Sequence, residues 1–201
     1  MIPLCKPPRL IQAVFQSTTV LVLATLTLSA VAKEANDDEL FLDRFEEPPP
    51  PLFFLHKNGV TVRCLEAAIG DQGQVNGLHY TKRARSQITT ANAETTCTSG
   101  IVNMSELFRD VGTFNRPIGS WDTSSVLYMN QMFFDASSFD QPLHHWDTSA
   151  VITMHGMFRN AASFNQDLSG WCVSLIPAEP PLFDSGAISW IEDRPVWGTC
   201  P

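Results

Sequence analysis

The second half of this chain repeats itself every 25 residues, and the repeat limits what the chain can fold into. Residues 121–143 and 146–168 align without a gap and are identical at 13 of 23 positions, which establishes the period of the repeat. Residues 96–118 align with both copies more loosely. The stretch Trp-Asp-Thr-Ser begins at Trp121 and again at Trp146, and Trp171 opens a third, incomplete copy. One such unit cannot bury its apolar side chains alone, so we expect the units to stack and share one core.

The spacing inside one unit indicates a short helix followed by an extended segment. In residues 126–136 the apolar positions recur every three or four residues, like one face of a helix, and Asp-Thr-Ser precedes them as capping residues. Residues 137–146 carry scattered apolar positions typical of a short strand. We therefore predict an α/β solenoid, a leucine-rich-repeat-like stack of about three 25-residue strand–corner–short-helix units with disulfide-tied caps at both ends.

Four cysteines follow the N-terminal segment, at positions Cys64, Cys97, Cys172 and Cys200. Cys97 and Cys172 occupy the same repeat column three rungs apart, about 14 Å at the spacing of neighbouring strands. That exceeds the roughly 7 Å between Cα atoms that a disulfide spans, so these two cannot pair with each other. Of the three possible pairings, the local one, Cys64–Cys97 and Cys172–Cys200, is the simplest, and it would tie an N-terminal cap (53–96) and a C-terminal cap (172–201) to the repeats (97–171).

The N-terminal segment has the pattern of a secretory signal peptide. Lys6 and Arg9 precede an uncharged run from Ile11 to Ala32 that ends in Ala-Val-Ala. An uncleaved membrane anchor is the alternative, since the run is nearly long enough to span a bilayer. Cleavage after residue 32 would remove Cys5 and leave an even number of cysteines, as expected in a secreted or cell-surface protein. Residues 33–52 are acidic and then proline-rich, which indicates an extended spacer.

The charge of the chain excludes some partners. The formal net charge is −8, and loss of residues 1–32 would remove two basic residues and make it more negative. Nucleic acids and anionic membranes favour a basic surface, so we expect neither as a partner, and no integral membrane span after cleavage of the leader.

No catalytic arrangement emerges from the sequence. There is no Gly-x-Ser-x-Gly motif, and Asp122 and Asp147 recur in register, as turn residues do. A metal site at His144 and His145 would need a third ligand, and a solvated corner is the simpler interpretation. Gly70, Gly73 and Gly77 predict that residues 70–83 are mostly turn. We predict no catalytic residue, no metal and no cofactor.

Polar columns on the predicted strands are candidates for contact with a partner. Asn115, Asp140 and Asn165 form one column, which either binds a ligand or satisfies backbone groups at a turn. A possible interaction surface comprises Arg116, Gln141, Gln166, His144 and His145. One Asn-x-Ser sequon begins at Asn103 and matters only where secreted proteins are glycosylated.

The repeat also resembles a known family. The stretch WDTSSVLYMNQMFFDASSFDQPLHHWDTSAVITMHGMFRNAASFNQDLSGW is similar to the surface-protein repeat described as BspA-like leucine-rich, also called the DUF285 repeat. The resemblance covers roughly residues 59–201 and implies an extracellular, mostly non-enzymatic protein that mediates protein or glycan interaction or adhesion. A structural envelope or matrix component without a specific ligand is the first alternative, and a secreted hydrolase is the second. Because this array is short, it offers a smaller binding face than longer arrays do.

Overall fold

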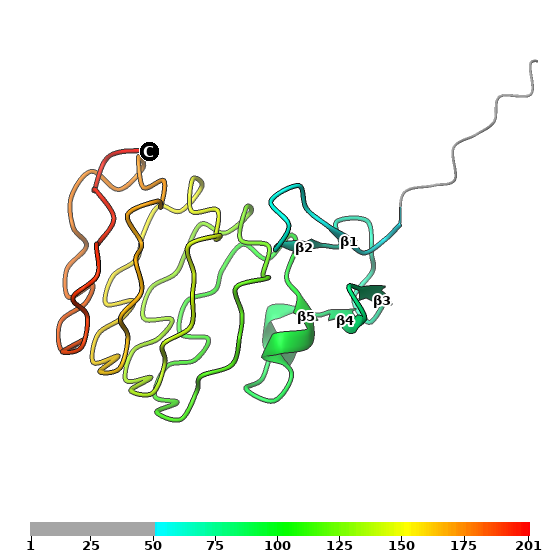
Figure 1. Cartoon of the computed structure of the whole chain (residues 1–201), viewed down its shortest axis with the longest axis horizontal. Coiled ribbons are helices and arrows are strands. Elements are labelled where there is room, and N and C mark those ends of the chain that lie inside the picture. The colour runs from blue at the N-terminus through cyan, green and yellow to red at the C-terminus, as the bar shows by residue number, and fades with distance from the viewer. Residues whose placement is uncertain (1–50) are drawn as a thin grey trace, which may run out of the picture. The chain divides into compact units, whose positions relative to one another are not determined.

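The computed structural model describes residues 51–201, and the predicted leader and nearly all of the predicted spacer lie outside the described residues. Within residues 51–201 the strands all lie between residues 54 and 97 (Figure 1). Strands β1 (Phe54–Leu55) and β2 (Val62–Arg63) form an antiparallel pair. Strands β3 (Gln72–Val75), β4 (Leu78–Lys82) and β5 (Thr96–Cys97) form a second sheet, in which β3 and β4 are antiparallel and β4 and β5 are parallel. Two three-residue 3₁₀ helices, η1 (Arg85–Gln87) and η2 (Ala93–Thr95), connect β4 to β5.

The prediction that residues 70–83 are mostly turn is wrong, because they form the β3–β4 hairpin. Asn76 and Gly77 make its two-residue turn with positive φ angles of 50° and 81°, as the right-handed twist of paired strands favours. Gly73 lies in β3 because a Cβ there would collide with the ring of Phe53. The Asn-Gly pair was therefore the decisive signal in this segment, and the number of glycines was misleading.

The predicted α/β solenoid is also wrong. Residues 51–201 contain two small sheets of short strands and the two short 3₁₀ helices, with no α-helix. Residues 98–201 consist of turns, bends and isolated bridges, and Figure 1 draws them as a plain tube. Neither the short helix expected at residues 126–136 nor the strand expected at residues 137–146 forms.

The hydrogen bonds of residues 126–136 explain why the helix is absent. Alternate backbone N–H groups donate to carbonyl oxygens of the following repeat at 2.9–3.1 Å: Met129 to Thr153, Gln131 to His155, Phe133 to Met157 and Asp135 to Arg159. Gln131 and Asp135 have φ angles of 53° and 56°, which interrupt a right-handed helix. Consecutive tight turns therefore produce apolar spacings of three and four residues that resemble the spacing of a helix.

The recurring Trp-Asp-Thr-Ser stretch is explained by bonds that each of its residues makes. The Trp146 indole N–H donates to the carbonyl of Ile118 at 3.1 Å, 28 residues earlier. The Thr123 hydroxyl donates to the carbonyl of Asp147 at 2.9 Å, 24 residues later. The Asp147 carboxylate accepts the N–H and the hydroxyl of Ser149, which closes the local turn. The motif thus recurs because it joins one repeat to the next.

The expected stacking of the units around one core is confirmed by the geometry of the aromatic rings. Trp146 stacks between Trp121 and Trp171, with ring centroids 6.2 and 6.4 Å away and nearly parallel planes. The column of Phe108, Phe133 and Phe158 has successive centroid distances of 6.0 and 5.4 Å. These side chains and the methionines of the repeats are almost fully buried in one core, and a smaller cluster lies under β1–β5.

Both disulfides join the predicted partners. Cys64 is bonded to Cys97 and Cys172 to Cys200, closing loops with sequence separations of 33 and 28 residues. The final segment adds one more coil to the repeats, since Leu168 N–H donates to the carbonyl of Asp193 and Phe158 N–H to that of Phe183. Each disulfide therefore holds a terminal segment of the described chain to its neighbour.

Candidate functional site

The column of Asn115, Asp140 and Asn165 is engaged in bonds between repeats. Oδ1 of Asn115 accepts the backbone N–H of Asp140 at 3.0 Å, and Oδ1 of Asp140 accepts that of Asn165 at 2.9 Å. Asn165 in turn accepts the N–H of Ile191 at 2.7 Å. Of the two interpretations of this column, the structure supports the one in which it satisfies backbone groups of the next coil.

Gln141 and Gln166 belong to the same network. Their Nε2 amides donate to Oδ1 of Asn115 at 2.8 Å and of Asp140 at 2.7 Å. Both side chains are half-buried, whereas Arg116 is exposed beside Asn115 in a shallow hollow. A partner that contacts either glutamine would therefore meet an amide that is already oriented by its neighbour.

His144 and His145 are exposed, with ring centroids 4.0 Å apart. Partial burial, and the neighbouring charge of His144, lower the pKa of His145. A hollow beside them is lined by His144, Gln166 and Asp167, and hydrogen bonds from Ser169 lower the pKa of Asp167. The structure thus brings His144 and Gln166 together, while Arg116 lies at a different hollow.

Nothing in the described part of the chain gathers metal ligands around these histidines. Within residues 51–201 no group of three or more His, Cys, Asp or Glu side chains is close enough together to hold a metal ion. Asn103, the residue of the sequon, is exposed, and its Oδ1 accepts the N–H of Ser105 at 2.8 Å.

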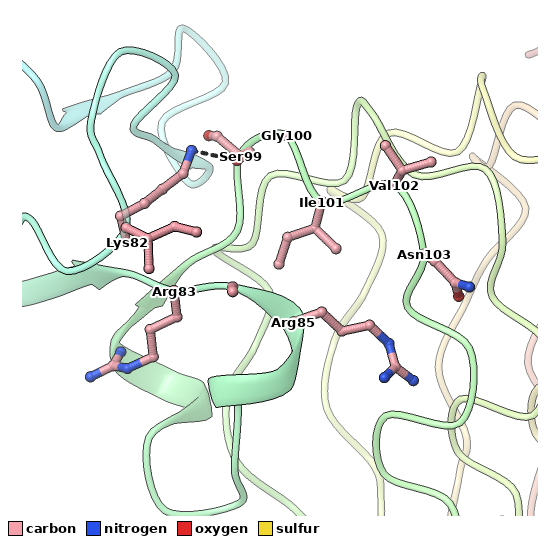
Figure 2. A pocket seen from close by; sticks show the side chains of 10 residues that line it. Lys82, Arg83, Arg85, Ser99, Gly100, Ile101, Val102 and Asn103 are labelled. Carbon is pink, nitrogen blue, oxygen red and sulfur yellow. Dashed lines mark hydrogen bonds between the residues drawn. The ribbon is translucent and has the colours of Figure 1, made fainter.

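A basic pocket that the sequence reasoning did not identify lies between the end of β4 and the first repeat. Its volume is about 310 Å³, and it is lined by residues 82–85 on one side and residues 99–103 on the other, with Ile69 at its edge. Figure 2 shows Ile101, Val102 and Asn103 on one side of the pocket, Arg85 on the other, Lys82 directed at Ser99, and the guanidinium of Arg83 turned away from residues 101–103. The side of the pocket formed by the first repeat carries the apolar side chains of Ile101 and Val102. The side formed by residues 82–85, at the end of β4, carries the basic side chains.

Hydrogen bonds to backbone carbonyls hold the three cations in place. Lys82 Nζ donates to the carbonyls of Cys64 at 3.0 Å and Ser99 at 2.5 Å, the second of which Figure 2 marks. Arg83 Nη1 donates to the carbonyl of Thr95 at 3.0 Å and to the hydroxyl of Thr96. Arg85 Nη2 donates to the carbonyl of Ser105 across the pocket.

These cations carry positive charge that the described residues do not neutralise directly. The ion pairs among residues 51–201 join Arg63 to Asp122, Arg109 to Glu106 and Asp110, and Arg194 to Asp184, and none includes Lys82, Arg83 or Arg85. Burial lowers the pKa of Lys82, and the nearby charge of Asp122 partly offsets that effect. The Asp122 carboxylate itself accepts the hydroxyl of Ser99 at 2.6 Å and lies 3.7 Å from Arg63. An anion in the pocket would face the charge of Arg85, which forms no ion pair with a carboxylate among residues 51–201.

A signal for this pocket was present in the sequence. Lys82, Arg83 and Arg85 put three basic residues in four positions of an otherwise acidic chain. The facing wall at residues 99–103 comes close to this run only in the folded chain, so the run alone does not indicate a pocket.

Comparison with known proteins places the chain in a family. A family model described as a Mycoplasma protein of unknown function, DUF285, matches residues 78–186, just over half of the chain. The chain belongs to the DUF285 family. No curated protein and no solved structure matches it. The match begins in β4 and includes residues 82–85 and 99–103 of the basic pocket as well as the three repeats.

The described helices of this DUF285 chain are short. Among residues 51–201, none of its helices has the length and apolar character that crossing a bilayer requires. The apolar run at residues 11–32, for which a signal peptide and an anchor were the alternatives, lies outside the described residues.

Proposed function

We propose that this chain is an exported, non-catalytic protein of the BspA-like surface type that binds an extracellular protein or glycan at the cell surface. Three features support the proposal: membership of the DUF285 family, a leader-like segment at residues 1–32, and two disulfides that an oxidising compartment would maintain. The repeats use their recurring polar residues to join one coil to the next, so the binding site that we propose lies elsewhere.

The observation that carries the proposal is the basic pocket. Lys82 and Arg85 stand at an opening of about 310 Å³ without a carboxylate partner among residues 51–201. Charge complementarity favours a ligand that brings a carboxylate or sulfate group. The acidic surroundings would repel a long polyanion, so the ligand we propose presents a short anionic element to the pocket.

A panel of short anions tests this proposal on the whole chain. The panel contains a glutamate hexapeptide, a hexauronate, a sulfated hexasaccharide, a lysine hexapeptide and a neutral hexasaccharide, each measured by calorimetry at low and at physiological salt. We expect binding to anionic members only, weakened at the higher salt concentration because exposed charges are screened.

Two charge reversals locate the site. Arg85→Glu changes the pocket, and Arg116→Glu makes the same change of charge at the exposed surface predicted from the sequence. We expect Arg85→Glu to reduce anion affinity at least tenfold and Arg116→Glu to leave it within about twofold. Loss of binding in Arg116→Glu alone would place the site on the predicted surface. A folded chain that binds no member of the panel would favour the structural alternative.

Export is tested separately by expressing the chain with residues 1–32 in a host that secretes proteins. We expect a secreted product that begins at Lys33, with its four cysteines oxidised, as intact mass with and without reduction would show. A cell-associated product that keeps residues 1–32 and free thiols would contradict export.

A further inference from the structure

Backbone hydrogen bonds form a ladder along one side of the repeats, beside the basic pocket. Leu127 N–H donates to the carbonyl of Val102 at 2.8 Å, and Ile152 N–H donates to the carbonyl of Leu127 at 3.0 Å. Parallel bridges join Asn103 to Tyr128 and Tyr128 to Thr153. The second and third repeats therefore each donate one N–H to the coil before them, at the same position of the 25-residue frame.

The ladder has a vacant position at its first rung. Val102 is the equivalent of Leu127 and Ile152, yet its N–H finds no acceptor among residues 51–201. The preceding segment, residues 82–85, lies across the pocket from it, and Figure 2 shows the space between the two walls. The pocket thus occupies the place where one more coil would continue the ladder.

The walls of this position suit an extended peptide better than a sugar. A backbone N–H that begins a ladder of parallel bridges is complemented by a main-chain carbonyl, as in the addition of a strand to a sheet edge. Val102 and Ile69 are 46% and 61% exposed and offer contact to an apolar side chain. Side chains of an extended peptide alternate in direction, so a neighbouring acidic side chain can turn toward Arg85.

We propose that the pocket binds a short, acidic, extended segment of a partner protein, with a carbonyl of that segment accepting the N–H of Val102 and a carboxylate meeting Arg85 or Lys82. The inference rests on the proposed binding function and narrows it to one class of ligand. A volume of about 310 Å³ is at the small end for ligand sites, so the pocket accommodates a short part of the segment.

Amide hydrogen exchange observed by NMR tests the inference on the whole chain. In the free protein we expect the Val102 amide to exchange at least a hundredfold faster than the equivalent amides of Leu127 and Ile152, which are hydrogen-bonded. The probe is an equimolar pool of acetylated, amidated hexapeptides in which Asp or Glu alternates with Ile, Leu, Val or Phe. We expect this pool to slow exchange at Val102 at least tenfold and to leave Leu127 and Ile152 unchanged.

Three controls make the result decisive. A matched pool with Lys or Arg in place of Asp or Glu should have no effect, and Arg85→Glu should abolish protection by the acidic pool while Arg116→Glu retains it. The third control is the hexauronate, which has charge but no peptide backbone. Protection of Val102 by the hexauronate equal to that by the acidic pool would overturn the peptide assignment.

The possible failures are distinguishable from failure of the proposed function. If Arg85→Glu weakens anion binding but no peptide protects the Val102 amide from exchange, the proposed function stands. The inference that a peptide carbonyl accepts the N–H of Val102 would then be overturned. Slow exchange at Val102 in the free protein would overturn the claim that its N–H lacks an acceptor. An absence of binding by every anion would overturn both.

Discussion

Substitution of Gly156 by alanine tests the turn structure of the repeats most directly. Glu106, Gln131 and Gly156 occupy one column, with left-handed φ angles of 61°, 53° and 57°. A helix at this position would require right-handed angles. The observed left-handed turn and a helix therefore predict effects of opposite sign for Gly156→Ala on the free energy of unfolding.

The magnitude follows from the backbone, because the methyl group itself fits. An added Cβ would lie 3.6 Å from Cγ of Gln131 and 3.9 Å from its next neighbours, which are ordinary contact distances. A left-handed conformation costs a non-glycine residue about 1–2 kcal/mol. The lower entropy of the unfolded alanine chain offsets roughly 0.4–1 kcal/mol of this. We expect Gly156→Ala to destabilise the protein by about 0.5–1 kcal/mol, whereas in a helix it would stabilise by about 1 kcal/mol.

Urea unfolding followed by tryptophan fluorescence, with both disulfides intact, measures this difference. The opposite change, Glu106→Gly, serves as the matched variant, because its side chain is exposed and makes only a 3.9 Å ion pair with Arg109. We expect Glu106→Gly to stabilise by about 0.5 kcal/mol, since glycine adopts this conformation without strain. Stabilisation by Gly156→Ala together with destabilisation by Glu106→Gly would refute the left-handed turns and restore the helix.

Three further predictions follow from the contacts described above. Replacing Cys64 and Cys97 together by alanine should destabilise the chain by roughly 3–4 kcal/mol, as a loop of 33 residues is released, and urea unfolding measures the loss. Thr123→Val removes the hydroxyl that donates to the carbonyl of Asp147 in a partly buried bond and should cost about 0.5–1.5 kcal/mol in the same assay; a loss below 0.3 kcal/mol would contradict the bond. Since burial is the larger cause of the lowered pKa of His145, His144→Ala should raise that pKa only part of the way to 6.5 in an NMR titration, and full recovery would contradict this order of causes. Because the folded-state pKa is the lower one, the unfolded chain takes up this proton first, so the contribution of His145 to stability should be lost as pH falls below about 6.5.

The sequence predicted the parts of the molecule that depend on matching positions of the repeat. Trp121, Trp146 and Trp171 stack because side chains 25 residues apart meet wherever identical units are laid together. The same register separated Cys97 from Cys172 and left the local pairing as the simplest, which the structure contains. These predictions required only the period and did not depend on the backbone conformation of each unit.

The backbone conformation itself was not determined by the apolar pattern. Spacings of three and four residues arise from a helix and equally from successive tight turns, since both return side chains to one side of the chain. The choice depends on whether an N–H such as that of Phe133 bonds within its own unit or to the carbonyl of Met157 in the next. That partner exists only once the units are stacked.

The candidate site also depends partly on the sequence alone and partly on the tertiary structure. The sequence by itself determined the repeat register and the basic run at Lys82, Arg83 and Arg85, and it made the local disulfide pairing the simplest of those possible. Only the tertiary structure decided that this run faces Val102 across a pocket and that Asn115 and Gln141 bond to each other. The physical reason is that a binding site depends on which donors and charges remain without partners, and partners are assigned by contacts between segments distant in the chain.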